Sequence, residues 1–174
     1  MDTAALLADA FGRIQGMVHG AVAGLTPSDL AFRPDPDANS IAWLVWHLTR
    51  IQDDHVADVA GTEQVWITQR WVERFGLPFD ERATGYGHSS AEVASVRAGV
   101  DELLGYYDAV HAETLRFVAG VEAADLDRVV DESWDPPVTL GVRLVSVVND
   151  DVAHAGQAAY VRGLLERRAV AAPD

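Results

Sequence analysis

The chain has 174 residues, of which 49% are hydrophobic and 23% charged, a globular composition that excludes a largely disordered or fibrous protein. Its formal net charge of −14 disfavours nucleic acid and anionic membrane surfaces as partners, and its lack of cysteine excludes disulfides, thiolate metal sites and a cysteine nucleophile. We therefore expect a single domain over residues 1–174, with neither a nucleic-acid nor a membrane partner.

The first 60 residues predict two long helices separated by a loop. Apolar residues recur with helical spacing from Thr3 to about Ala23, and this stretch lacks the cationic start of a secretory signal, so we expect a cytoplasmic protein. Thr26 followed by Pro27 has the pattern of an N-cap and first helical turn, which predicts a short helix there. The stretch "FRPDPDANS" is a proline-broken loop, and a second long helix is expected over Ile41–Ala60.

A long crossover from Gly61 to His88 comes next, with one short helix expected near Glu63–Arg74. A connection of this length inside a compact domain is usually functional. The capping-box pattern in "HSSAEV" predicts that a third long helix begins there and covers Ser90–Val118. A fourth long helix is expected over Thr139–Arg167.

The fold class predicted from these elements is all-α, because sustained alternation of the kind found in strands does not occur. A sequence echo indicates the topology: "AGLTPSDL" from Ala23 recurs as "AGVEAADL" from Ala119, so the chain resembles two helix-loop-helix halves. Two such halves joined by the long crossover between the second and third helices predict a four-helix bundle with up-down-down-up connectivity.

The predicted fourth helix carries a candidate metal site in "VNDDVAHAGQ". Asp150 lies four residues before His154 and Asp151 lies three before it, so either carboxylate shares a helix face with the imidazole. A carboxylate and an imidazole on successive turns can converge on one divalent ion. Spacing alone leaves both acids open as ligands, and Gln157 continues the same stripe.

The second predicted helix offers His47 as a third ligand. This histidine lies among apolar residues in "SIAWLVWHLTRIQDDH", and a histidine on a buried face needs a polar partner. A divalent ion held jointly with Asp150 and His154 would be such a partner and would leave coordination positions open for water or substrate. A hydrogen-bonded core histidine is the alternative interpretation.

The remaining histidines and the end of the second helix are expected to be exposed to solvent. The histidines interpreted as surface residues are His19, His88 and His111. The group interpreted as a solvated helix end consists of Asp53, Asp54 and His55.

Three stretches together resemble the DinB/YfiT-like superfamily, especially its actinobacterial branch of mycothiol-dependent enzymes: "NSIAWLVWHLTRIQDDHV", the crossover with "GYGHSSAEV", and "VRLVSVVNDDVAHAGQAAYVRG". The resemblance implies an up-down-down-up bundle, commonly a homodimer, that holds zinc, nickel or a similar divalent ion. It implies His47, Asp150 and His154 as the ligands. Many members have His or Glu where this chain has Asp150, and the shorter Asp implies an ion that lies nearer the fourth helix, binds through water or is also held by Asp151.

The same resemblance implies a transferase that activates a low-molecular-weight thiol, mycothiol in actinobacteria, for attack on an electrophilic substrate in detoxification or stress response. The absence of cysteine agrees, because the thiol would then arrive on a small molecule. The candidates for supporting the ligands or handling protons are Asp54, Asp151 and Gln157. The candidates for binding carboxylate groups of the thiol are Arg50 and Arg143. A metal-dependent hydrolase and a non-catalytic dimeric bundle stay open as alternatives.

Overall fold

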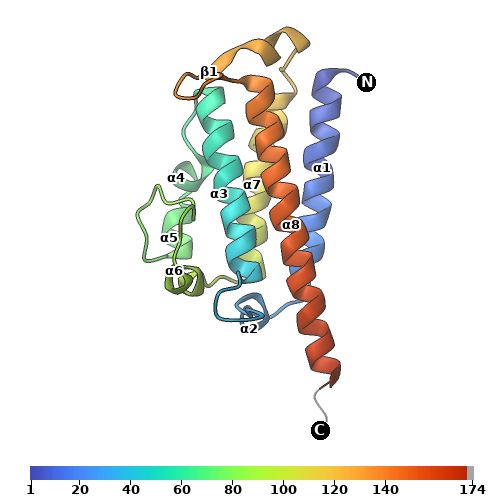
Figure 1. Cartoon of the computed structure of the whole chain (residues 1–174), viewed down its shortest axis with the longest axis vertical. Coiled ribbons are helices and arrows are strands. Elements are labelled where there is room, and N and C mark those ends of the chain that lie inside the picture. The colour runs from blue at the N-terminus through green and yellow to red at the C-terminus, as the bar shows by residue number, and fades with distance from the viewer. Residues whose placement is uncertain (172–174) are drawn as a thin grey trace.

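Four long helices dominate the computed structural model, which describes residues 1–171 (Figure 1). They are α1 (Thr3–Val22), α3 (Ile41–Ala60), α7 (Val100–Val118) and α8 (Leu140–Ala171). Both α1 and α3 pack against α7 and α8. In Figure 1, α1 and α8 run in one direction and α3 and α7 in the other. The all-α prediction is confirmed, and the connectivity is the expected up-down-down-up arrangement.

Side-chain caps fix where the helices begin. The Ser40 hydroxyl accepts a hydrogen bond from the Trp43 N–H at 3.1 Å and starts α3 at the predicted residue. Thr26 and Asp29 form a reciprocal capping box that starts α2 (Pro27–Leu30), also as predicted. The sequence echo has a structural counterpart, because a short 3₁₀ helix, η1 (Ala123–Asp127), follows α7 as α2 follows α1.

The third long helix is shorter than predicted. The stretch expected to be one helix over Ser90–Val118 divides into α6 (Ser90–Ser95) and α7, with Val96 buried at the bend. The Glu102 carboxylate accepts a hydrogen bond from the Gly99 N–H at 3.0 Å and so caps a new helix start. The prediction of one continuous helix is therefore wrong, because Gly99 and Glu102 start a new helix after the chain has placed Val96 in the core.

The crossover contains two short helices where one was expected. They are α4 (Val65–Thr68) and α5 (Trp71–Phe75), separated at Arg70, whose φ of 58° is left-handed and interrupts a continuous helix. Figure 1 shows α4, α5 and α6 along one side of the bundle, beside α3. The crossover therefore forms a layer that covers the middle of α3.

A small hairpin between α7 and α8 was not anticipated. Its strands, β1 (Val129–Asp131) and β2 (Val138–Thr139), pair antiparallel at one end of the bundle (Figure 1). The loop between them exposes Trp134, which is 66% accessible. The all-α class holds, since these short strands lie outside the helical core.

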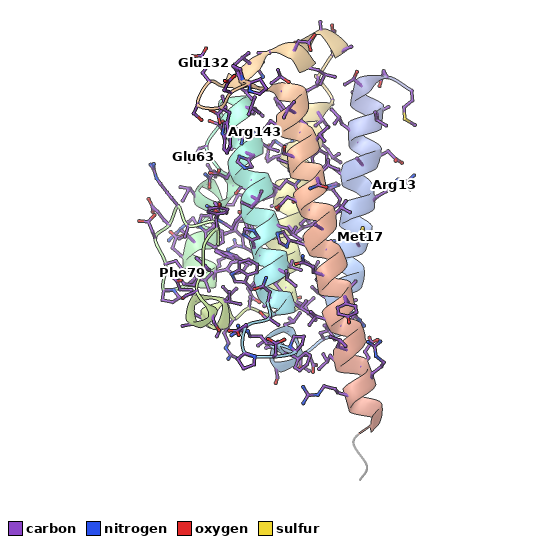
Figure 2. All side chains as sticks on the ribbon, in the orientation of Figure 1. Arg13, Met17, Glu63, Phe79, Glu132 and Arg143 are labelled. Atoms are coloured by element: carbon purple, nitrogen blue, oxygen red, sulfur yellow. The ribbon has the colours of Figure 1, made fainter. Side chains whose placement is uncertain are left out.

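Side chains fill the space between the four long helices, whereas Arg13 on α1 points outward (Figure 2). The core is aromatic as well as aliphatic, with Trp46, Tyr106 and Tyr107 fully buried. His111 is also buried and stacks on Tyr107, so its assignment to the surface is wrong. Within the described part of the chain, none of the helices is both long and apolar enough to cross a bilayer.

Candidate metal centre

His47 on α3 and two residues of α8, Asp150 and His154, converge on one point. One potential ligand atom from each lies within 4.8 Å of the other two. The Nε2 atom of His154 is 3.5 Å from Oδ1 of Asp150, one helical turn away. The antiparallel packing of α3 on α8 brings His47 to the same level, with its ring centroid 4.8 Å from that of His154.

Hydrogen bonds fix which nitrogen each imidazole turns toward this point. The Nδ1 atom of His47 lies 2.6 Å from the carbonyl oxygen of Thr84, and the Nδ1 atom of His154 lies 3.0 Å from Oε1 of Gln157. Each partner is a carbonyl oxygen that can only accept, so both Nδ1 atoms carry the proton. Both Nε2 atoms are therefore the ones turned toward this point, which is the orientation found in metal-bound histidines.

The electrostatics of the three groups also favour a cation between them. Burial lowers the pKa of His47, which keeps its ring neutral. The hydrogen bond of His154 Nε2 to Asp150 raises the pKa of His154, and a cation bound at Nε2 would replace the proton that this nitrogen otherwise shares with Asp150. Burial alone would raise the pKa of Asp150, but the hydrogen bond and charge of His154 outweigh it and hold that pKa below its usual range. An ionised carboxylate therefore faces two imidazole nitrogens across a gap that a positive charge would fill.

The residues fit a divalent ion. Metal–ligand bonds of about 2.1 Å place neighbouring ligand atoms about 3.0–3.4 Å apart, close to the 3.5 Å between His154 and Asp150. Small side-chain rotations would bring the remaining atoms, within 4.8 Å, to that spacing. The second carboxylate oxygen of Asp150, Oδ2, is buried without a hydrogen-bond partner among the described residues. A buried carboxylate oxygen without a protein partner is a position where a bound ion would supply the missing contact.

Aromatic side chains wall the site and include a histidine that the sequence did not suggest. Trp43 stacks on His47 with ring centroids 4.5 Å apart. Trp43 also donates from Nε1 to Nδ1 of His88 at 3.3 Å, and His88 stacks on Trp46. The interpretation of His88 as a plain surface residue is therefore wrong, because it lies half-buried against both tryptophans.

Gly85 allows the crossover to lie directly over His47. Its φ of +97° is a conformation that other residues rarely adopt, and a Cβ there would lie 2.8 Å from Nδ1 of His47. The neighbouring Thr84 carbonyl thereby reaches the imidazole. The "GYG" of the crossover was part of the family pattern, but only the folded chain reveals its contact with His47.

The two adjacent acids of α8 point in different directions. Asp150 joins the cluster, whereas Asp151 is 0% accessible and neither of its oxygens has a hydrogen-bond partner within residues 1–171. Burial, followed by the negative charge of Asp150, raises the pKa of Asp151 well above its usual value. Of the two ligands that spacing left open, the geometry therefore favours Asp150.

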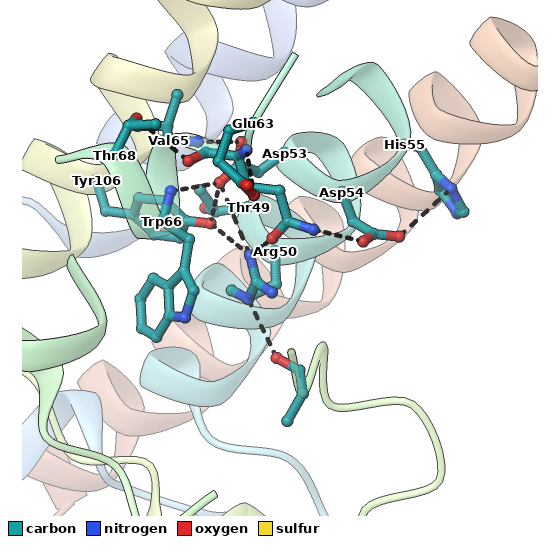
Figure 3. Close-up of polar contacts among 12 residues, drawn as sticks. Thr49, Arg50, Asp53, Asp54, His55, Glu63, Val65, Trp66, Thr68 and Tyr106 are labelled. Carbon is teal, nitrogen blue, oxygen red and sulfur yellow. Dashed lines mark hydrogen bonds and ion pairs between the residues drawn. The ribbon is translucent and has the colours of Figure 1, made fainter. Parts of the chain in front are cut away.

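Arg50 belongs to a buried network on the crossover side of α3 (Figure 3). It is 0% accessible and donates to the Ala83 carbonyl at 3.1 Å, to Gln64 Oε1 at 2.8 Å and to the Tyr106 hydroxyl at 3.2 Å. Its guanidinium is 3.7 Å from Asp53. These contacts hold the crossover on α3 and leave Arg50 inaccessible to the carboxylates of a ligand, contrary to its predicted role.

Asp53 is buried beside Arg50, so the prediction that it belongs to a solvated helix end is wrong. Its carboxylate accepts hydrogen bonds from the N–H groups of Val65 at 2.9 Å and Trp66 at 2.8 Å, and from the Tyr106 hydroxyl at 2.8 Å (Figure 3). Asp53 therefore caps α4 from another helix, a long-range contact that local sequence does not reveal.

The other predicted polar residues lie farther along the α3–α8 seam. Asp54 accepts from Gln64 at 2.7 Å and is half-exposed, with its second oxygen 3.8 Å from His55 (Figure 3). Arg143 donates to Nδ1 of His55 at 3.0 Å and to Asp131 at 2.9 Å. Asp54 and Arg143 are thus engaged by protein partners and lie outside the three-residue cluster.

His19, the remaining predicted surface histidine, is half-exposed on α1. Its Nε2 atom pairs with Asp108 on α7 at 2.8 Å, distant in sequence from the cluster on α3 and α8. This position agrees with a surface role and makes His19 a suitable control for substitutions at the metal centre.

Comparisons with known proteins place these features in context. The sequence matches the family model described as mycothiol-S-transferase over residues 6–167. A search among curated proteins returned no significant match. The chain is also similar to a crystal structure described as the conserved protein of locus from Enterococcus faecalis, with 31% sequence identity and a TM-score of 0.88. That alignment covers 95% of this chain and 98% of the other.

Proposed function

Because the chain belongs to the mycothiol-S-transferase family, we propose that it is a divalent-metal-dependent transferase that activates a low-molecular-weight thiol of the mycothiol type. The thiol sulfur forms a bond to an electrophilic carbon, the leaving group departs with its bonding electrons, and the thiol proton passes to a base. The proposal includes zinc or nickel as the ion, a cytoplasmic homodimer as the working form, and detoxification or stress response as the setting.

The observation that carries the proposal is the convergence of His47, Asp150 and His154, with the Nε2 atoms of both histidines turned toward the same point. A divalent ion held there would lower the pKa of an incoming thiol and favour the thiolate at neutral pH, without any protein cysteine. The protein contributes one carboxylate and two neutral imidazoles, so its own negative charge only partly balances a divalent cation. That balance favours an anionic sulfur over a neutral ligand.

The surrounding residues orient the ligands and restrict access to them. Thr84 and Gln157 hold the two imidazoles through their Nδ1 protons. Trp43 and the crossover shield His47, which is 6% accessible, from bulk water. Through its hydrogen bond to Nδ1 of His154, Gln157 acts by positioning that histidine. Asp54, half-exposed on the same seam about two helical turns from His47, is the carboxylate that we propose accepts the thiol proton through water.

A thiol-transfer assay tests the proposal. Protein loaded with zinc or nickel would be mixed with mycothiol and monobromobimane, and formation of the fluorescent thioether would be compared with the uncatalysed rate. We expect metal-dependent acceleration that His47→Ala abolishes and that His19→Ala, at a surface histidine paired with Asp108, leaves unchanged. No acceleration with either metal, or full activity of His47→Ala, would contradict the proposal. Hydrolysis of a simple ester without thiol would instead favour a hydrolase.

A further inference from the structure

A groove of about 680 Å³ begins beside the metal centre and follows α8 toward its C-terminal end. Leu44 of α3 and Ala153 of α8 line it near the centre, and Leu164 lines it at the far end. Ala153 directly precedes the ligand His154, and Leu44 lies one turn before His47 on α3. Residues 153–164 of a helix span about 16 Å, so the groove is long enough for an extended ligand.

Two polar side chains of the groove, those of Asp35 and Gln157, are engaged by the protein. Asp35, in the loop that forms the opposite wall, accepts hydrogen bonds from the N–H groups of Asp37 and Ala38, both at 2.9 Å. The carbonyl oxygen of Gln157 accepts from His154 at 3.0 Å. What remains for a ligand is mainly apolar surface, together with the ring of Tyr160, which is 66% accessible.

Gly156 keeps the groove open. A Cβ at this position would have no atom within 4 Å, although the residue lies inside α8 and lines the groove. Glycine inside a helix destabilises it relative to alanine. The sequence therefore has an unfavourable residue at a point of the groove wall where a side chain would protrude into the space without contacting the protein.

We propose that this groove binds the apolar part of the electrophile, an extended aliphatic or aromatic group, and presents its reactive end to the metal centre. The inference rests on the proposed transferase function. Its volume lies within the range of about 300–1,000 Å³ that is typical of small-molecule sites. Gln157, which lines the groove, also hydrogen-bonds the candidate ligand His154, and this link favours a substrate over an unrelated partner. The net charge of −14 disfavours an anionic substrate.

Titration with the neutral fluorescent probe N-phenyl-1-naphthylamine tests the groove without requiring turnover. The wild-type protein should bind the probe saturably, and Gly156→Leu should weaken that binding at least tenfold because the new side chain fills the groove. The control is Gly12→Leu on α1, since Gly12 is another helical glycine whose Cβ would meet nothing within 4 Å. This variant should bind the probe like the wild type.

Displacement of the probe by neutral n-alkanols gives a second measurement. The affinity should rise about three- to fourfold for each added methylene from hexanol to decanol, as expected when each methylene leaves water. Absence of saturable probe binding, equal binding by Gly156→Leu, or no dependence on chain length would overturn the groove assignment. A wild-type dimer that covers the groove would give the first of these results.

Zinc content, measured on the same samples, separates this inference from the proposed function. Gly156→Leu should retain wild-type zinc content, because the glycine contributes no side-chain atom to the centre. Zinc binding without probe binding would overturn the groove assignment alone. Probe binding without zinc binding would instead contradict the metal centre on which the transferase proposal depends.

Discussion

Replacing each of the two adjacent acids of α8 in turn is a sharp test of the site. Asp150→Asn and Asp151→Asn are near-isosteric changes one residue apart, yet only Asp150 belongs to the cluster with His47 and His154. We expect Asp150→Asn to lose most of its zinc affinity and Asp151→Asn to keep it. The second variant is thus a matched control for the first.

The size of the effect follows from the charge and position of Asp150. Its lowered pKa means that the carboxylate is ionised at neutral pH, so the substitution removes one negative charge within 4.8 Å of both other ligand atoms. Two unit charges about 4 Å apart interact by about 4 kcal/mol at an effective dielectric constant of about 20. Allowing for partial exposure of the site, we expect a loss of about 100- to 1,000-fold in affinity, more than the 10- to 100-fold typical of a lost supporting hydrogen bond.

Isothermal titration calorimetry of chelator-stripped protein with zinc gives the affinities, and circular dichroism checks that both variants are folded. Asp151 is fully buried with no hydrogen-bond partner in the described chain, so Asp151→Asn should be at least as stable as the wild type. Equal zinc affinity of Asp150→Asn and the wild type would refute the ligand assignment. Equally weak binding by both variants would refute the distinction between the two acids.

Three further predictions concern the crossover and the core. Gly85→Ala should lower stability by about 1–3 kcal/mol in urea unfolding, because its Cβ would lie 2.8 Å from Nδ1 of His47. The control Gly87→Ala also has the strain of a positive φ but open space around its Cβ, so it should lower stability less. Asp53→Asn should lower the free energy of unfolding by about 3–5 kcal/mol, since it leaves the buried Arg50 guanidinium without its counter-charge. The exposed control Asp58→Asn should change stability little. A loss of stability below about 1 kcal/mol for Asp53→Asn would contradict the network. Burial lowers the pKa of His111, so the unfolded chain binds its proton more readily and stability falls as pH drops below about 6.5. His111→Phe should therefore make the loss of urea-unfolding stability between pH 7 and 5 less steep, and an unchanged slope would refute this.

Much of the helical frame could be predicted because its signals are local. α3 begins and ends at the predicted residues, since Ser40 caps its start and Gly61, in a left-handed conformation, ends it. The break between α6 and α7 was missed because the Gly99–Glu102 pair lies inside an otherwise helical pattern. The buried position of Asp53 was missed because its partners lie in the crossover and on α7, more than ten residues away.

The candidate site likewise has a part that local sequence predicts and a part that only the fold decides. Helical spacing brought Asp150 or Asp151 together with His154, and the topology brought His47 opposite them. Successive residues of a helix differ by about 100° in direction, so only the orientation of α8 decides which acid faces α3. The carbonyl of Thr84 entered the site through the path of the crossover, which no periodicity in the sequence describes.

The most direct test of the metal centre is anomalous diffraction from crystals of the protein grown with zinc or nickel. We predict one peak at about 2.0–2.2 Å from Nε2 of His47, Nε2 of His154 and a carboxylate oxygen of Asp150. A peak held by other residues, or no peak between these three, would contradict the account.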